Sequence, residues 1–311
     1  MASSTDLADN IDEALWFGIA DPDHPDEEAK ASVAAEVARV SGLKPFPVVA
    51  SKILRELSRD SFSIPRISNL MESDPALASM VLRLVNSALY GTAKGCTSVD
   101  QAVIRLGARR VRELVAAAAT MQMFHDARGV GIIFRDHCAA TAAIVRVLGQ
   151  HHELPGSDAL FLAGLLHDVG KLLLMETREF DYANLSPQLL ARPDALHTLE
   201  RAQLGYDHAV LGANVMQAWK IPDPIPQIVA WHHQPMRAYA EGGDIGPQVA
   251  LLRIADHIAW YLAHTTMPSL RFNDTIASSA DGSWVGLSAS DIERMWVWMV
   301  EARAEVMQIF G

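Results

Sequence analysis

The stretch that decides the fold reads Gly164-Leu165-Leu166-His167-Asp168-Val169-Gly170-Lys171-Leu172-Leu173-Leu174. It places a titratable pair and a lysine in a run that is otherwise apolar, which predicts a helix over 158–176 that is buried on most sides. A carboxylate in such surroundings is costly unless a cation or hydrogen-bond donors compensate for it. Asp168 therefore needs a partner, and the two candidates are a metal ion and Lys171.

The rest of the chain has the composition of a helical protein. Half of its 311 residues are apolar, which is enough for one large domain or two ordinary ones with a real core. Alanine and leucine are abundant and no segment alternates strictly between apolar and polar residues, so helices are favoured over strands. We predict an all-α, multi-helix bundle.

Cysteine content and hydropathy bear on the compartment. Cys96 and Cys138 form neither a disulfide framework nor a zinc-type pair, which fits a reducing compartment. The amino terminus lacks a secretory signal pattern, and no stretch reaches the roughly 18 uninterrupted apolar residues that a membrane span needs. We therefore expect a cytoplasmic protein that does not interact with membranes.

Charge argues against a nucleic-acid partner. The net charge is −11, and residues 1–30 hold nine acidic residues and one lysine, so they carry −8 of it. An acidic chain repels polyanions, although small anionic ligands remain compatible. The one basic cluster comprises Arg105, Arg109, Arg110 and Arg112. Arg105 and Arg109 are weak candidates for gripping phosphate, but a solvated or salt-bridged helix face is the favoured interpretation.

Capping signals mark several helix boundaries. Asp74 before a proline predicts one helix start, Ser98 predicts another with the form of a capping box, and Gly107 predicts a helix end. Ser288 or Ser290 is expected to cap the last helix, after a polar loop near 272–287. Further helices are predicted near 133–150, 207–219, 225–233 and 246–264. Leu15-Trp16-Phe17 suggests a short docking segment. A stripe on the last helix, which is either buried or faces a partner, comprises Met295, Trp296, Trp298 and Met299, and core packing is the default expectation for it.

Other polar side chains also recur inside apolar segments. Asp256 shares a helical face with Leu252 and Trp260, so it is expected to point inward. Histidines in comparable settings are His137, His208, His232 and His233. Taken singly, each is more typical of a hydrogen-bonded core residue than of a ligand. Jointly, imidazole and carboxylate groups from separate helices are the ligand set for a divalent transition metal in a bundle interior.

The order of these motifs resembles the HD superfamily of metal-dependent phosphohydrolases. A lone His, a His-Asp pair, a His, a His-His pair and a final Asp follow one another along the chain. The resemblance implies a metal bound by His137, His167, Asp168 and Asp256. A second metal would add His208, His232 and His233. The implied cofactor is a divalent ion such as Fe, Mn, Zn or Mg.

A finer resemblance covers about residues 42–260 and points to the HDOD branch, the HD-related output domains of bacterial signalling proteins. It rests on Leu43-Lys44-Pro45-Phe46-Pro47, Ser73-Asp74-Pro75-Ala76-Leu77, Asn86-Ser87-Ala88-Leu89-Tyr90-Gly91 and Ala102-Val103-Ile104-Arg105-Leu106-Gly107, and on the stretch from Leu204 to Pro235. We accordingly predict an acidic extension with a helix over 1–41 and an HDOD domain over 42–265. That domain would comprise an N-terminal helical lobe (42–128) and an HD-like lobe (129–265), with a loop and helix (266–311) packed on it.

The resemblance implies a non-catalytic output module that regulates motility, biofilm formation or stress responses through signalling proteins or a bound ligand. The alternative is a metal-dependent phosphohydrolase acting on a nucleotide or cyclic dinucleotide, because every metal-ligand position is kept. Related cyclic di-GMP phosphodiesterases carry Gly-Tyr-Pro after the His-His pair, where this chain has Gln234-Pro235-Met236. In the enzymatic alternative, Asp168 and Lys171 would be catalytic, with Lys171 assisting the phosphate. Lys171 as a buried partner of Asp168 is an equally good interpretation.

Overall fold

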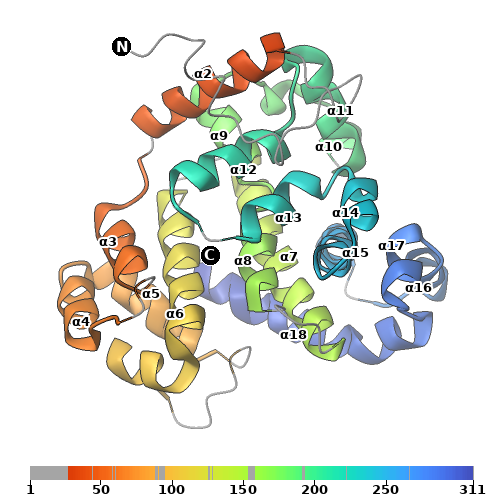
Figure 1. Cartoon of the computed structure of the whole chain (residues 1–311). Coiled ribbons are helices and arrows are strands. Elements are labelled where there is room, and N and C mark those ends of the chain that lie inside the picture. The colour runs from red at the N-terminus through yellow and green to blue at the C-terminus, as the bar shows by residue number, and fades with distance from the viewer. Residues whose placement is uncertain are drawn as a thin grey trace.

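The computed structural model of the chain describes residues 27–310, apart from 44, 58, 60, 88–89, 91–94, 125–126, 128, 153–157, 191–192, 222 and 266. Every regular element in this part of the chain is a helix, which confirms the predicted all-α class (Figure 1). The segment Leu15-Trp16-Phe17 lies outside the described residues. A helix with the length and apolar character to cross a bilayer is not found among the residues described.

The N-terminal helices form one packed group around a long central helix. Helices α3, α4 and α5 all pack on α6, on the left of Figure 1. Helix α2 instead lies along α12, from the other half of the chain. The bounds are α2 (Glu27–Leu43), α3 (Val48–Leu57), α4 (Ile64–Glu72), α5 (Pro75–Val85) and α6 (Val99–Met123).

Predicted capping residues explain where these helices start. Asp74 Oδ1 accepts a hydrogen bond from Leu77 N at 3.0 Å, and Ser98 Oγ accepts one from Gln101 N at 3.3 Å. Gly107 adopts φ 80° and ψ 160°, which interrupts α6 where a helix end was predicted. Left-handed φ values suit glycine because it has no Cβ.

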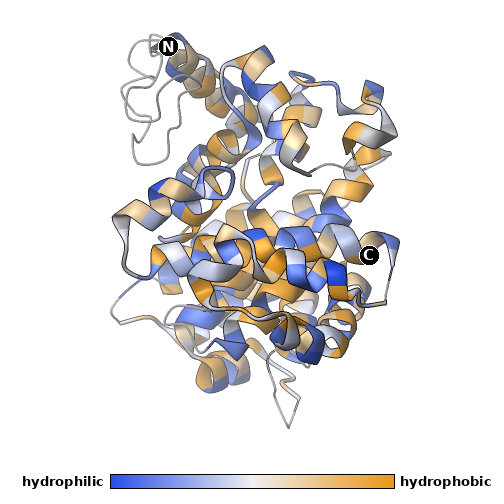
Figure 2. Cartoon of the chain, turned by 90° about the vertical axis from the view of Figure 1, so that its right-hand side faces the viewer, coloured by the Kyte–Doolittle hydropathy of each residue, from blue (hydrophilic) through white to orange (hydrophobic). Residues whose placement is uncertain are grey.

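The remaining helices are organised around α7, which packs against α8, α15 and α18. Figure 2 shows apolar residues concentrated in the middle of the molecule. The bounds are α7 (Val130–His151), α8 (Asp158–Leu166), α9 (Val169–Thr177), η3 (Tyr182–Asn184), α10 (Pro187–Leu190), α11 (Pro193–Leu204), α12 (His208–Ala218), α13 (Ile225–Trp231), α14 (Pro235–Glu241), α15 (Ile245–His264), α16 (Leu270–Ala277), α17 (Ala280–Val285) and α18 (Ala289–Phe310).

The predicted continuous helix over 158–176 is wrong, because the chain turns at His167-Asp168 between α8 and α9. The turn lets α9 approach α12 closely. An ideal Cβ added to Gly170 would lie 2.0 Å from the carbonyl oxygen of His208, so only glycine fits there. Periodicity could not reveal this break, since residues on both sides of it are equally buried.

The C-terminal part departs from prediction in two further places. The expected loop near 272–287 contains α16 and α17, which are capped by Ser269 and Ser279. Trp298 is 54% exposed, whereas Trp296 is buried as predicted. Ser288 is the cap of α18, since its Oγ accepts a hydrogen bond from Asp291 N at 3.2 Å. The domain boundaries at 41–42, 128–129 and 265–266 stay predictions.

Candidate metal centre

Five helix-associated segments bring the predicted ligands to one place in the interior. His137 lies within α7, His167 and Asp168 form the turn between α8 and α9, and Asp256 lies within α15. His208 is the first residue of α12, and His232 and His233 follow the last residue of α13. All seven predicted ligand positions therefore converge, which sequence separation alone did not establish.

One half of the cluster comprises His137, His167 and Asp256, with one nitrogen or oxygen of each within 4.8 Å of the others. His137 Nε2 lies 2.8 Å from Asp256 Oδ1, and the imidazole N–H donates to the carboxylate. His167 Nε2 lies 3.9 Å from the same Oδ1. The indole of Trp260 packs on the His137 ring at 4.6 Å between centroids.

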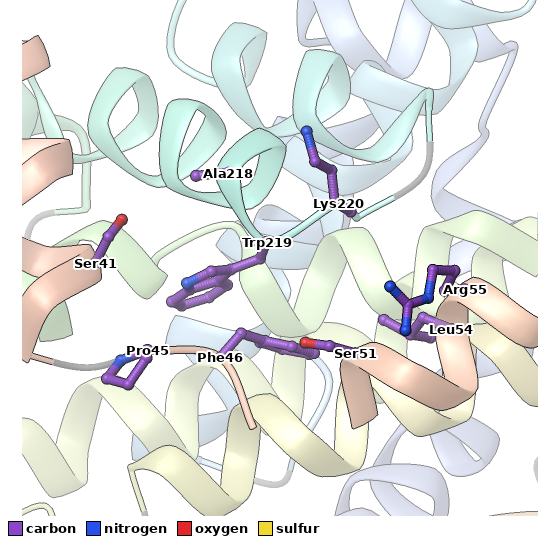
Figure 3. Close-up of a pocket in the computed structure, with 9 residues that line it drawn as sticks. All are labelled: Ser41, Pro45, Phe46, Ser51, Leu54, Arg55, Ala218, Trp219 and Lys220. Atoms are coloured by element: carbon purple, nitrogen blue, oxygen red, sulfur yellow. The ribbon is translucent and has the colours of Figure 1, made fainter. Parts of the chain in front are cut away.

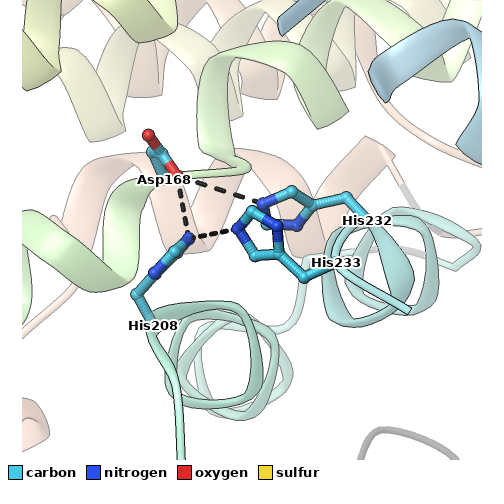
Figure 4. A group of neighbouring side chains, drawn as sticks. All are labelled: Asp168, His208, His232 and His233. Atoms are coloured by element: carbon cyan, nitrogen blue, oxygen red, sulfur yellow. Dashed lines mark hydrogen bonds and ion pairs between the residues drawn. The ribbon is translucent and has the colours of Figure 1, made fainter. Parts of the chain in front are cut away.

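The other half comprises Asp168, His208, His232 and His233 (Figure 4), whose ligand atoms also lie within 4.8 Å of one another. Asp168 Oδ1 lies 3.0 Å from His208 Nε2 and 4.0 Å from His232 Nε2. His233 Nε2 lies 3.0 Å from His208 Nε2. The four groups offer three imidazoles and one carboxylate.

Asp168 joins the two halves through its two carboxylate oxygens. Oδ1 faces His208, whereas Oδ2 lies 3.5 Å from His167 Nε2 and 3.9 Å from His137 Nε2. Oδ2 also accepts a hydrogen bond from Lys171 Nζ at 2.7 Å. Lys171 thus provides the partner that the sequence required for Asp168, and its ammonium group is bound to that carboxylate.

Backbone carbonyls orient two of the imidazoles. His167 Nδ1 lies 2.8 Å from Gly164 O, and His232 Nδ1 lies 2.6 Å from Val229 O. A carbonyl oxygen only accepts, so the proton of each ring sits on Nδ1 and the lone pair of Nε2 faces the cluster. Both Nε2 atoms are buried and have no hydrogen-bond partner among the described residues.

Sequence reasoning missed Glu200, a fully buried carboxylate on α11. Its Oε2 accepts from His208 Nδ1 at 2.6 Å and from His208 N at 2.8 Å, and its Oε1 accepts from the Tyr182 hydroxyl at 2.6 Å. A carboxylate that accepts a hydrogen bond from the second ring nitrogen of a metal-ligating histidine fixes the orientation of that ring. No sequence signal pointed to Glu200, because a glutamate between Leu199 and Arg201 is typical of an exposed helix face.

Opposing effects set the acidity of the two aspartates. Burial raises the pKa of Asp168, but His167, Lys171 and His208 outweigh burial and hold that pKa well below its ordinary value. Burial likewise raises the pKa of Asp256, and the hydrogen bond from His137 more than offsets it. Both groups are therefore carboxylates, which is the form that binds metal.

The histidines divide into neutral and charged groups. Burial lowers the pKa of His167 and of His232, which keeps these rings neutral. Burial also disfavours charge on His208, but the adjacent Glu200 carboxylate raises its pKa to about 9. A metal at this position would replace the His208 Nε2 proton.

The residues present fit a divalent metal. Neutral imidazoles with orphaned lone pairs, a carboxylate that bridges both halves and a carboxylate behind His208 are the features of a metal-ligand set. His137, His167, Asp168 and Asp256 would hold one ion, and Asp168 with His208, His232 and His233 would hold a second. Imidazole-rich sites suit Zn or Fe, and carboxylate ligands also suit Mn, so Mg is the least suited of the four candidates.

The predicted phosphate-binding arginines have structural partners in the fold. Arg105 Nη1 donates to the carbonyl oxygen of Gly95 at 3.1 Å. Arg109 Nε lies 3.6 Å from Glu113 Oε1, as expected for a salt-bridged helix face. A phosphate role for Arg105 and Arg109 stays a prediction.

Comparisons with known proteins agree with this fold. The HDOD domain family matches residues 43–235. An HDOD domain protein of unknown function from Geobacter sulfurreducens has a TM-score of 0.67 at 20% identity, covering 90% of this chain and 98% of that one. A structure from Shewanella amazonensis, described as a candidate phosphohydrolase, has a TM-score of 0.68 at 22% identity, covering 89% and 98%.

One curated relative is similar to this chain at the level of sequence. An uncharacterised protein from Treponema pallidum is 27% identical over 207 residues, which cover 65% of this chain and 40% of the relative. The match therefore spans less than half the length of that relative. Because the family match extends over more than half of the chain, this protein belongs to the HDOD family.

Proposed function

We propose that the chain is a non-catalytic signalling module that holds divalent metal at the His/Asp cluster and acts through protein partners or a bound ligand. The setting would be the cytoplasm of a bacterium, in the control of motility, biofilm formation or stress responses. Metal in this proposal stabilises the helical core and fixes the surface that a partner recognises.

The observation that carries the proposal is the burial of the cluster. His167 and His208 are 0% exposed, and Asp168 and His232 are 1% exposed. A substrate phosphate would have to reach the ligand atoms directly to be hydrolysed there. These four residues are closed off from solvent in this conformation, and the partly buried imidazole of His233 lies between solvent and His208 Nε2, 3.0 Å from that atom. Gln234-Pro235-Met236 also replaces the Gly-Tyr-Pro of the cyclic di-GMP phosphodiesterases.

Metal analysis combined with a phosphodiesterase assay tests this function. The purified chain should contain Fe, Mn or Zn, and the Asp256→Asn variant should contain less. Neither protein should hydrolyse bis(p-nitrophenyl) phosphate or cyclic di-GMP above the rate of metal salts alone. Turnover by the unmodified chain that Asp168→Asn abolishes, while circular dichroism shows a retained fold, would overturn the proposal.

A metal-dependent phosphohydrolase is the second candidate. One observation favours it: the Asp168 carboxylate lies between two groups of possible metal ligands. One group contains His137, His167 and Asp256, and the other contains His208, His232 and His233. A metal pair would supply an activated water and stabilise charge on a phosphate ester. Lys171 is bound to Asp168, so it would assist substrate only after that contact broke. Purified protein that stays metal-free in the presence of divalent ions would count against this candidate.

A further inference from the structure

Two hollows lie beside α3 and share Arg55 as a lining residue, and neither is lined by a residue of the His/Asp cluster. The first has a volume of about 530 Å³ and lies between α3 and the end of α12. The second, of about 380 Å³, lies between α3 and α4. The two hollows meet at Arg55, and we call them together the α3 groove.

Positive charge is concentrated along the α3 groove. The charged residues that line it are Lys52, Arg55, Arg59, Arg66, Lys220 and Glu56. Five cations and one carboxylate leave a surplus of about four positive charges. The net charge of the whole chain is −11, so the groove has the opposite sign of charge to the protein as a whole. A local positive field on an acidic protein favours anions of small size over nucleic acid.

The one carboxylate in the groove, that of Glu56, orients two arginines but neutralises only one positive charge. Glu56 is buried, and its Oε2 lies 3.1 Å from Arg59 Nη1 and 3.4 Å from Arg66 Nε. Two guanidinium groups thus share one negative charge. Lys52, Arg55 and Lys220 have no carboxylate within ion-pair distance in the described part of the chain. Their charges are available to a ligand.

The first hollow adds an apolar floor beside these cations. Phe46, Leu54 and Trp219 are each less than 9% exposed and come from three separate segments. The Phe46 and Trp219 rings pack with centroids 5.4 Å apart. In Figure 3 these rings lie in the middle, with Arg55 and Lys220 toward one side. Apolar walls with a few placed charges are typical of small-molecule sites.

Lys220 occupies a position that the backbone would favour for glycine. Its φ is 62°, in the left-handed region. The cap of α12 holds it there, because Lys220 N donates to Gln217 O at 2.9 Å and Ile221 N donates to Met216 O at 3.0 Å. A side chain kept at such a site in spite of strain is a reason to look for a function. Here the side chain is a cation at the rim of the hollow.

We propose that the α3 groove binds a phosphorylated small molecule with an apolar ring system, of the nucleotide class. The phosphates contact Arg55 and the neighbouring cations, since guanidinium groups match phosphate oxygens in a bidentate way. The ring system packs against the floor formed by Phe46 and Trp219. This site is separate from the His/Asp cluster and requires no metal.

Calorimetric titration of the full chain with ADP tests the proposal, with pyrophosphate and adenosine as its two halves. ADP should bind more tightly than either half, and its affinity should fall as salt rises from 50 to 200 mM. Arg55→Glu should weaken ADP binding at least tenfold. Arg271→Glu is the matched control, because Arg271 is an exposed arginine on α16, and it should change the affinity less than twofold.

Lys220→Gly separates a ligand-binding role from a structural one. Glycine relieves the left-handed backbone, so the melting temperature should stay the same or rise. Loss of the cation should nevertheless weaken ADP binding at least threefold. A structural role alone would leave the affinity unchanged.

Three results would overturn the proposal. The first is no heat of binding with ADP at 1 mM. The second is pyrophosphate binding as tightly as ADP, which would remove the ring system from the ligand class. The third is binding that survives Arg55→Glu but is lost in Asp256→Asn, which would place the phosphates at the His/Asp cluster.

Discussion

At the scale of single residues, Lys171 supplies the positive charge that compensates the buried Asp168 carboxylate. Its side chain is buried and its Nζ lies 2.7 Å from Asp168 Oδ2. Burial lowers the pKa of Lys171, but Asp168 and Glu200 more than offset this, so the pKa is raised and the ammonium keeps its proton. The pair therefore persists as a buried ion pair at neutral pH.

Lys171→Met should destabilise the metal-free protein by about 3–5 kcal/mol, since it leaves Asp168 charged and without its cation. Added Zn²⁺ or Mn²⁺ should recover part of this loss, because a metal supplies the missing positive charge. Urea denaturation with and without metal measures both effects. The control is Lys52→Met at an exposed lysine, where little change is expected. Equal stability of the Lys171→Met and unmodified proteins would contradict the ion-pair role.

The sequence predicted the inward-facing residues of the site but not what orients them. His137, His167 and Asp256 were identified because polar groups in apolar segments need partners. Glu200 and the carbonyl oxygens of Gly164 and Val229 could not be identified, because their roles depend on contacts between segments far apart in sequence or on backbone atoms that every residue has.

At the scale of elements, the contact between α9 and α12 depends on a residue without a side chain. Gly170 approaches the His208 backbone so closely that a Cβ would overlap its carbonyl oxygen. The same contact places the turn at His167-Asp168 beside the start of α12. Helix positions were predictable from periodicity and caps, whereas this break was not, since it depends on backbone proximity rather than on side-chain pattern.

Gly170→Ala should therefore lower the free energy of unfolding by roughly 3 kcal/mol or more, because rigid backbone atoms cannot move to relieve the overlap. Gly42→Ala is the matched control. An added Cβ at Gly42, in α2, would meet nothing within 4 Å, so that variant should be unchanged or up to about 1 kcal/mol more stable. Chemical denaturation measures both. An unchanged stability of Gly170→Ala would contradict the close approach of α9 to the His208 backbone.

The cap of α18 provides a second test at this scale. Ser288 Oγ accepts from Asp291 N, and Ser288 N donates to Asp291 Oδ2 at 3.0 Å, which forms a reciprocal box. Ser288→Ala should destabilise the protein by about 0.5–2 kcal/mol, and Ser290→Ala by less. Thermal denaturation ranks the two variants. Equal effects would contradict Ser288 as the cap.

The contribution of this box should depend on pH in one direction. Hydrogen bonds from Ser288 lower the pKa of Asp291 below its ordinary value of 3.8. The stabilisation is therefore complete above 3.8 and is lost as pH falls through the lower, folded-state pKa. The stability gap between the unmodified protein and Ser288→Ala should shrink below pH 4. A gap that widened there would contradict the sign of this effect.

At the scale of the whole molecule, the His/Asp cluster lies where separate helices meet, so metal would act as a cross-link. The ligand positions come from α7, the turn before α9, α12, the end of α13 and α15. A ligand that binds only the folded state stabilises it in proportion to the logarithm of its concentration. Metal occupancy should therefore affect the stability of the entire chain.

Removal of metal with a chelator should lower the melting temperature, and re-addition of Zn²⁺ or Mn²⁺ should restore it. At 100 times the dissociation constant the gain is about 2.7 kcal/mol. Asp256→Asn should show a much smaller response, because it removes one carboxylate ligand. Differential scanning calorimetry measures the shift. An identical response in both proteins would place the bound metal outside the cluster.

Helix α12 begins at His208 and ends beside Trp219, so one rigid element reaches from the His/Asp cluster to the α3 groove. An occupant at either end that shifted this helix would change affinity at the other end. Thermodynamic linkage makes such an effect symmetrical: the factor by which ADP altered metal affinity would equal the factor by which metal altered ADP affinity. In an HDOD chain with this linkage, the concentration of the nucleotide would set how much metal is bound at the His/Asp cluster.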